Sequence, residues 1–146
     1  EYETLAGVNL PSQGYFLETG TRHYVRFVED LGKYDIVAEG RDIRYNAQEL
    51  QPVGANVNFV EPDNGVLKVR TYEKGVGVTL ACGTGACASV LVLHRLGLCD
   101  DEVEVEMLGG CLKVSIKDDE VYMCGDAHFV FEGKYIEKRS IYEKNR

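Results

Sequence analysis

Hydrophobic and polar residues alternate in short runs along most of this chain, a pattern typical of β-strands with one buried face. Such runs cover residues 23–28, 56–60 and 66–72, and the last two flank Asp63-Asn64-Gly65. Because Asn-Gly readily adopts the positive φ angles of a tight turn, these two runs are expected to pair. The pattern therefore predicts an antiparallel hairpin in the first half of the chain.

The second half of the chain shows a further series of strand-like runs, at residues 103–108, 112–116, 121–123 and 128–131. Turns are expected at Gly109-Gly110 and Asp118-Asp119, so these runs predict a meander. Residues 34–45 predict a short helix, although Gly40 is unfavourable inside one. Residues 133–146 are rich in charge and predict a solvated tail.

One segment differs from all the others. Residues 84–96 read TGACASVLVLHRL and precede Gly97, a residue type that suits the position just past a helix end. The segment has no polar stripe until His94, and a helix that is hydrophobic on every side has to be buried. The sequence therefore predicts a single α+β domain over residues 1–146, with a mostly antiparallel curved sheet or barrel wrapped around a central buried helix.

Charge and length narrow the possible functions. The 146 residues include 24 acidic and 16 basic side chains, for a net charge of −8. Nucleic-acid binding requires clustered positive charge, so we expect no nucleic-acid partner. The longest apolar run, residues 86–93 broken only by Ser89, is far too short to span a bilayer. We therefore expect a soluble protein with no membrane partner.

The cysteines do not form a metal-binding pattern. Their number is odd, their spacing is irregular, no CxxC pair is present, and the three histidines are scattered. We therefore expect no metal site and predict reduced thiols in the cytoplasm. The five are Cys82, Cys87, Cys99, Cys111 and Cys124.

Cys82 lies immediately before the predicted buried helix, in the run LACGTGAC at residues 80–87. The glycines leave backbone N–H groups open to a ligand, and the start of a helix attracts anions such as a carboxylate. The partial positive charge at the helix start is also expected to lower the pKa of the Cys82 thiol. These features are consistent with removal of an α-proton, although a structural thiol remains the alternative. Cys87 lies about 140° further around the helix and is expected in the core.

Residues 70–88, RTYEKGVGVTLACGTGACA, closely resemble the second catalytic motif of diaminopimelate epimerases. The resemblance extends over most of the chain in the same order, through residues 19–23, 54–60, 109–114 and 129–133. The chain thus resembles the C-terminal half of a two-domain, cofactor-independent epimerase. In that family two cysteines flank the α-carbon of the substrate, one as thiolate base and one as thiol acid, without pyridoxal or metal.

The resemblance implies a role for several residues. Cys82 is implied to be one of the two catalytic thiols, with His23 and Glu73 close by to tune the thiols or hold the substrate. The N–H groups of Gly83 and Thr84 are implied to bind the reacting carboxylate. From the residues alone, His23 would be a core or surface histidine and Glu73 a solvated carboxylate.

The far end of the substrate is the least certain part of the resemblance. Asn56 is implied to bind it, although a strand asparagine alone would be an edge or turn residue. Lys74 stands where the family usually has an arginine. Lysine keeps the positive charge but loses the planar, two-pronged fit of a guanidinium to a carboxylate. Thr21 and Arg22 replace a common Asn-Pro pair, and Val78 a frequent glutamate. Another amino-acid racemase of the same fold therefore remains an alternative.

The first catalytic cysteine of the family lies in an N-terminal half, within a Cys-Gly-Asn type motif that this sequence lacks. We therefore expect this chain to be inactive alone and to need that N-terminal domain, or a second copy of itself that supplies another Cys82. The small-molecule partner would be an amino acid, and the pathways would be lysine and cell-wall synthesis. A non-catalytic amino-acid-binding domain is the alternative from a different class.

Overall fold

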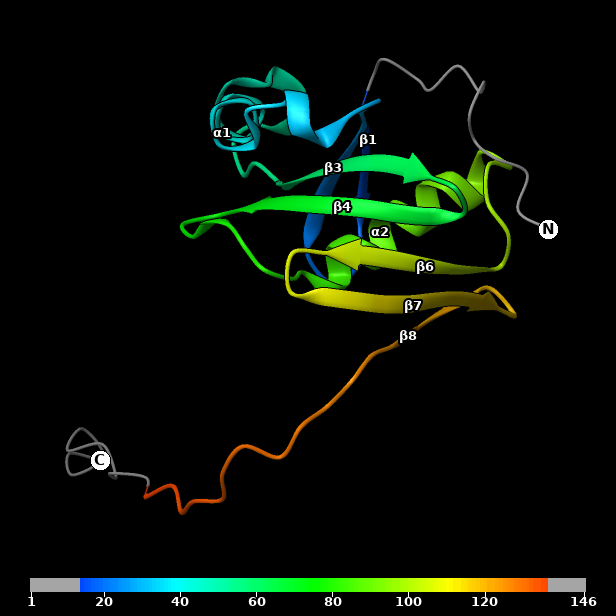
Figure 1. Ribbon diagram of the computed structural model, residues 1–146. Helices are drawn as coiled ribbons and strands as arrows, with labels where there is room; N and C mark the ends of the chain where they lie inside the picture. The colour runs from blue at the N-terminus through cyan, green and yellow to red at the C-terminus, as the bar shows by residue number, and fades with distance from the viewer. Residues whose placement is uncertain (1–13, 137–146) are drawn as a thin grey trace, which may run out of the picture.

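The computed structural model describes residues 14–136, which form one curled sheet with a helix on each face (Figure 1). The strands are β1 (Tyr15–Glu18), β2 (Arg22–Phe27), β3 (Asn56–Asp63), β4 (Val66–Glu73), β5 (Gly77–Val78), β6 (Glu102–Met107), β7 (Gly110–Lys117) and β8 (Glu120–Cys124). The helices are α1 (Ile36–Asn46), α2 (Gly83–Arg95), and the short 3-10 turns η1 (Leu31–Lys33) and η2 (Gln48–Leu50). The strand order is β1-β2-β3-β4-β6-β7-β8, with β5 paired to β4.

Two neighbouring pairs in the sheet, β2–β3 and β4–β6, are parallel, and the other pairs are antiparallel. Parallel neighbours cannot be joined by a tight turn, so each pair needs a crossover connection. The connection from β2 to β3 contains α1, and the connection from β4 to β6 contains α2. The prediction of a mostly antiparallel α+β fold is confirmed, and these two crossovers place one helix on each face of the sheet.

Helix α2 lies inside the curl of the sheet. It contacts both β1 and β8, which stand at opposite ends of the strand order, so the sheet bends around it. Val90 and Leu93 are completely buried on this helix, as the sequence predicts. One strip is more open than predicted: Thr84, Cys87 and Leu91 border a cleft between α2 and β8. The helix is therefore wrapped on most sides, with its first turns facing the opening.

Helix α1 covers the opposite, outer face of the sheet. Successive side chains of β3 point to alternate faces, so apolar residues of this strand need cover on both. Val57 and Phe59 point outward to Ile36 and Ile43, whereas the intervening residues of β3 point toward α2. Gly40, unfavourable for a helix in the sequence, has a steric role here. A Cβ atom at this position would lie 2.6 Å from the Cβ of a β4 tyrosine, so α1 can pack this closely only with glycine.

Two of the three predicted turns are confirmed by their backbone angles, and the third lies at residues 108–109, one residue before the predicted Gly109-Gly110. Asn64 and Gly65 have φ values of 47° and 85°, and Asp118 and Asp119 have values of 52° and 63°. Two consecutive positive φ angles match the right-handed twist of the flanking strands. These turns therefore set the register of the β3–β4 and β7–β8 hairpins.

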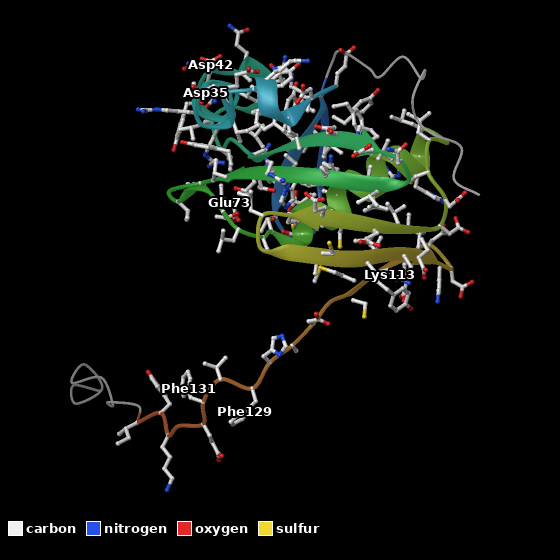
Figure 2. All side chains as sticks on the ribbon, in the orientation of Figure 1. Asp35, Asp42, Glu73, Lys113, Phe129 and Phe131 are labelled. Carbon is white, nitrogen blue, oxygen red and sulfur yellow. The ribbon has the colours of Figure 1, made fainter. Side chains whose placement is uncertain are left out.

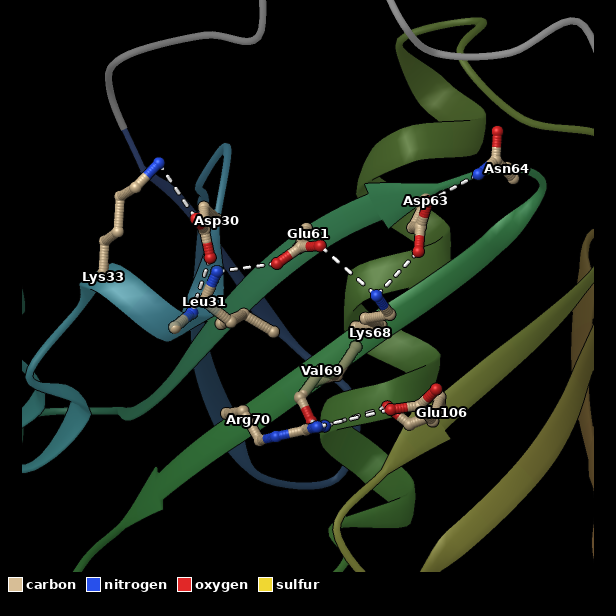
Figure 3. A network of polar contacts seen from close by, with 11 residues as sticks. Asp30, Leu31, Lys33, Glu61, Asp63, Asn64, Lys68, Val69, Arg70 and Glu106 are labelled. Carbon is tan, nitrogen blue, oxygen red and sulfur yellow. Dashed lines mark hydrogen bonds and ion pairs between the residues drawn. The ribbon is translucent and has the colours of Figure 1, made fainter.

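Polar side chains on β3 and β4 connect these two strands to η1 and to the neighbouring strand β6 (Figure 3). Glu61 accepts a hydrogen bond from the Leu31 N–H at 2.6 Å and lies 3.5 Å from the Lys68 ammonium. Arg70 reaches Glu106 on β6, with 3.3 Å between Nη2 and Oε1. Such half-exposed ion pairs contribute about 1 kcal/mol or less each, so they orient these elements more than they stabilise them.

The predicted strand at residues 128–131 is wrong. After β8 the chain leaves the sheet in an extended path, and Phe129, Val130 and Phe131 are at least 80% exposed (Figures 1 and 2). The local pattern indicates strand propensity, but a strand also needs a neighbouring edge, and the path of the chain provides none here. The predicted solvated tail agrees with exposure at residues 133–136, and its remainder, residues 137–146, lies outside the described residues.

Because neighbouring exposed apolar side chains promote association, replacing Phe129 and Phe131, which flank the exposed Val130, by serine is expected to weaken self-association of the chain. Neither ring is packed in the fold, so the free energy of unfolding is expected to change by less than about 0.5 kcal/mol. Sedimentation at several concentrations and denaturant unfolding would measure the two effects. The control replaces the scattered exposed residues Val37 and Val53 by serine; an equal loss of association in the control would contradict the prediction.

Candidate functional site

The site is built around the start of α2. Cys82 is the N-cap residue of this helix, in an extended conformation, and its side chain makes no capping hydrogen bond. The loop before it is attached to the β6–β7 turn, because the Gly109 N–H donates to Leu80 O at 2.7 Å. Cys82 N–H in turn lies 3.5 Å from the Met107 sulfur. These contacts hold the thiol in place and leave the first N–H groups of the helix free of side-chain caps.

Three strands place polar residues beneath this helix start. His23 of β2, Asn58 of β3 and Thr71 of β4 are each at most 1% exposed. Asn58 Nδ2 lies 3.0 Å from His23 Nδ1, and the Thr71 hydroxyl donates to Asn58 Oδ1 at 2.9 Å. Buried polar groups are costly unless they are paired, and here each finds a partner in the neighbouring strand. The inner face of the sheet is therefore polar where it meets α2.

The Thr84 hydroxyl connects this polar layer to the thiol. Its oxygen lies 3.0 Å from His23 Nε2 and 3.6 Å from Cys82 Sγ. Thr21, in the β1–β2 turn, brings a second hydroxyl to 2.8 Å from His23 Nε2. The Thr19 hydroxyl donates to Thr84 O at 3.1 Å. The structure thus brings the predicted residues His23, Thr84 and Cys82 together.

The end of β4 supplies the remaining predicted residues. The Thr79 hydroxyl donates to Glu73 Oε1 at 2.7 Å, and the Lys74 N–H donates to Asn56 Oδ1 at 3.1 Å. Figure 2 shows Glu73 at the end of β4. Asn56, Glu73 and Lys74 line a cleft of about 410 Å³, to which Thr21 and Arg22 also contribute.

A second cleft, of about 320 Å³, lies on the other side of the Thr84 hydroxyl. It is lined by Thr19, Gly83 and Thr84 together with apolar residues of α2 and β8. The first cleft is mostly polar in its residues and the second is partly apolar. Of these two clefts, the second borders the first turn of α2, whereas the first is lined mostly by residues of the strands and of the loops around them.

Burial raises the pKa of the Cys82 thiol above its ordinary value. The Thr84 hydroxyl and the nearby Gly85 N–H oppose this rise, whereas the carboxylate of Glu73 adds to it. The expectation of a lowered pKa is therefore wrong for this site, because removal from water outweighs the helix-start donors. Cys82 carries its proton at neutral pH and has a carboxylate beside it.

Burial has the opposite effect on the pKa of His23: it disfavours the charged imidazolium and so lowers the pKa of the ring. The negative charge of Glu73 opposes this effect but does not reverse it. His23 is therefore a neutral ring at neutral pH. A neutral histidine beside a protonated thiol forms a hydrogen-bond network rather than an ion pair.

Two residues of the site escaped the sequence analysis, Asn58 and Thr71. A signal was present, because each is a polar residue at an inward position of a strand, where side chains alternate between the two faces. Metal ligands do not gather here: among residues 14–136, no group of three His, Cys, Asp or Glu side chains could hold an ion. Over the same residues, no helix has the length and apolar content needed to cross a bilayer.

Sequence comparisons identify relatives of this fold and site. A family model described as diaminopimelate epimerase matches residues 15–130. Proteins of that name from Clostridium perfringens and Archaeoglobus fulgidus are 50% and 46% identical over 118 and 120 residues. These matches cover 80% and 82% of this chain but only 42% of each relative, so the chain spans less than half the length of the relatives it matches.

Solved structures agree on the fold. A phenazine biosynthesis protein of the PhzF family from Enterococcus faecalis superimposes with a TM-score of 0.53 at 16% identity, covering 73% of this chain and 38% of that one. A putative phenazine biosynthesis PhzC/PhzF protein from Clostridium difficile gives 0.52 at 12% identity, covering 73% and 39%.

The curled α+β sheet around a helix whose N-cap is a cysteine is the class of fold to which the chain belongs. The chain belongs to the diaminopimelate epimerase family.

Proposed function

We propose that this chain supplies one half of a cofactor-independent active site that inverts the α-carbon of diaminopimelate from the LL to the meso form. The single observation that carries the proposal is the Cys82 sulfur at the start of α2, one hydroxyl group away from the buried His23. The membership of the family supplies the reaction class. The chain would act in the cytoplasm as a domain comprising residues 1–146, in lysine biosynthesis.

The start of α2 suits the reacting carboxylate. Gly83 and Thr84 are the first residues of the helix, and their N–H groups have no partner within it. Removal of the α-proton spreads negative charge onto the carboxylate, and fixed N–H donors stabilise that charge. A carboxylate bound there would place its α-carbon beside Cys82 Sγ. Asn56, Glu73 and Lys74 would then contact the distal part of the substrate from the first cleft.

Cys82 is suited to proton donation because its thiol is protonated at neutral pH. A second cysteine, as thiolate, would take the α-proton from one face, and Cys82 would deliver its Sγ proton to the other face. The electron pair left by the C–H bond is held on the carboxylate between these steps. One turnover leaves Cys82 as thiolate and the second cysteine as thiol, the pair that catalyses the reverse reaction. Glu73 and His23 tune these protonation states, and no cofactor or metal takes part.

The second cysteine is proposed to come from outside this chain. A single side chain rarely reaches both faces of one carbon, and this chain spans 42% of the length of its matched relatives. The N-terminal half typical of the family would supply the thiolate, or a second copy of this chain would present its own Cys82. Lys74 in place of an arginine favours one alternative substrate class: another amino acid acted on by a racemase of the same fold.

The test is exchange of the substrate α-proton in deuterated water, measured by NMR for LL-diaminopimelate. The chain alone is expected to show no exchange, and addition of a separately expressed N-terminal half is expected to start it. A panel of other amino acids in the same assay distinguishes a racemase of different specificity. Sustained exchange by the monomeric chain alone would refute the need for a second thiol. If the reconstituted protein binds diaminopimelate in calorimetry but shows no exchange by NMR, the chain is a non-catalytic binding domain instead.

A further inference from the structure

Asn58, which the proposed reaction does not use, stands at the centre of the buried hydrogen-bond network. Its side chain is completely buried between the sheet and α2. Its Nδ2 atom lies 3.0 Å from His23 Nδ1 and 3.3 Å from Tyr24 O, and its Oδ1 atom lies 2.9 Å from the Thr71 hydroxyl. The Asn58 amide, on β3, therefore contacts β2 through its NH₂ group and β4 through its oxygen.

These contacts fix which way the amide faces. A backbone carbonyl such as Tyr24 O can only accept a hydrogen bond, so the group that faces it has to be the NH₂ group of Asn58. Rotating the amide by half a turn would place Oδ1 at the 3.3 Å distance from Tyr24 O and would set two acceptors against each other. The Thr71 hydroxyl donates to Oδ1 in the observed orientation. The orientation of the Asn58 amide follows from the network.

The orientation of the amide determines the tautomer of His23. Because the Asn58 NH₂ group faces Nδ1, this ring nitrogen has to accept, and the single hydrogen of the neutral ring is on Nε2. Nε2–H then donates toward the hydroxyl oxygens of Thr21 and Thr84, 2.8 Å and 3.0 Å away. Since the Thr84 oxygen accepts from His23, its own hydrogen is available to Cys82 Sγ at 3.6 Å.

We propose that Asn58 is a positioning residue: it holds His23 as the Nε2–H tautomer and thereby orients the Thr84 hydroxyl as a donor to the Cys82 sulfur. A hydroxyl that donates to sulfur stabilises the thiolate that forms when Cys82 gives up its proton. The link to catalysis rests on the function proposed above. The assignment of the tautomer is independent of that function, because it follows from contacts within the chain.

Two further observations agree with this role. Glu73 of β4 is the charged group that acts on the His23 ring, and Cys82 of α2 is the titratable group beyond the Thr84 hydroxyl. A Cβ atom at Gly85 would lie 2.3 Å from Asn58 Oδ1 and 3.2 Å from Cys82 Sγ, so glycine is what lets the helix close over this network.

The test is nitrogen NMR of the chain with ¹⁵N-labelled histidine, which reads the tautomer of each ring from its two nitrogen shifts. His94 and His128 serve as internal references. His23 is expected to show a protonated Nε2 and an unprotonated Nδ1 at neutral pH. A hydrogen on Nδ1 instead would overturn the proposal, whether or not the protein is an epimerase.

The decisive variant is Asn58→Asp, which replaces the NH₂ donor by a carboxylate acceptor of the same shape. His23 is expected to move its hydrogen to Nδ1, and its pKa is expected to rise by about 1 unit or more. Asn46→Asp, on the exposed end of α1, adds the same charge without touching His23 and should change neither. A folded Asn58→Asp chain that keeps the Nε2–H tautomer would overturn the proposal.

Thr71 offers a second test in case Asn58→Asp does not fold. Thr71→Val removes the hydroxyl that holds Oδ1 with little change of shape, and Thr71→Ser keeps it. In the valine variant His23 is expected to populate both tautomers, and in the serine variant only the Nε2–H tautomer. Identical histidine spectra for the two variants would contradict the proposal that Asn58 holds the tautomer. In the reconstituted enzyme, Asn58→Asp is expected to shift the pH dependence of turnover, and an unshifted pH profile would overturn the catalytic part alone.

Discussion

Replacing Cys82 by alanine in a protein that contains both halves of the fold is expected to lower epimerisation by about 10²- to 10⁴-fold, the usual contribution of a positioned acid or base. The expectation follows from the loss of the thiol proton that the start of α2 offers beside a bound carboxylate. Cys82 is 8% exposed, and the thiol leaves only a small void, so circular dichroism is expected to stay unchanged. Turnover of diaminopimelate measures the effect.

The matched control is Cys99→Ala, which also removes a partly buried thiol but lies at the far end of α2. Burial raises the pKa of Cys99 to about 11, and its side chain packs against the core with its sulfur 3.9 Å from Val90 O. Its loss is expected to leave turnover within about twofold of the parent, since no proton-transfer group is removed. If the Cys82 variant stays as active as the Cys99 variant, the proposed mechanism has to be abandoned.

The largest effect on stability is expected from Gly85→Ala. Alanine favours a helix over glycine by about 1 kcal/mol, so an exposed site would be stabilised. Here the new Cβ atom would lie 2.3 Å from Asn58 Oδ1 and 3.3 Å from the Thr71 hydroxyl, and a completely buried amide would have to move. Overpacking together with a broken buried hydrogen bond is expected to cost about 2–4 kcal/mol net, measured by urea unfolding.

Gly83→Ala provides the control within the same helical turn. Its Cβ atom would meet the end of the Met123 side chain at 2.8 Å, and that flexible, half-exposed side chain can move aside. The free energy of unfolding is therefore expected to stay within about 1 kcal/mol of the parent. Equal stabilisation of both variants would show that the packing around Gly85 is looser than described.

Local patterns predicted the elements whose formation depends on nearby residues. The uninterrupted apolar segment before Gly97 identified α2, and turn residues such as Asn64 and Asp118 identified the hairpins. The patterns did not predict β1, β5, or the two parallel pairs, because such pairing depends on which distant strand lies alongside. Residues 128–131 were wrongly assigned for the same reason: their composition suits a strand, but the structure offers no neighbour for it.

The site was predictable in part. The grouping of Cys82 with His23 and Glu73 was implied by the family resemblance, whereas spacing along the chain does not show that they meet. The pKa of Cys82 was predicted with the wrong sign because a helix start is a local feature and desolvation is a tertiary one. Asn58 was missed because its contact with His23 depends on the parallel β2–β3 register, which pairs Asn58 with Val25 and which no local pattern indicates.

The five thiols differ greatly in their accessibility to reagents. Cys111 and Cys124 are exposed on the outer strands, whereas Cys82 is buried and protonated at neutral pH. Alkylating agents react with the thiolate at an accessible surface, so these two outer cysteines would be modified first. A covalent probe aimed at the helix start therefore requires serine at positions 111 and 124 before its stoichiometry reports on Cys82.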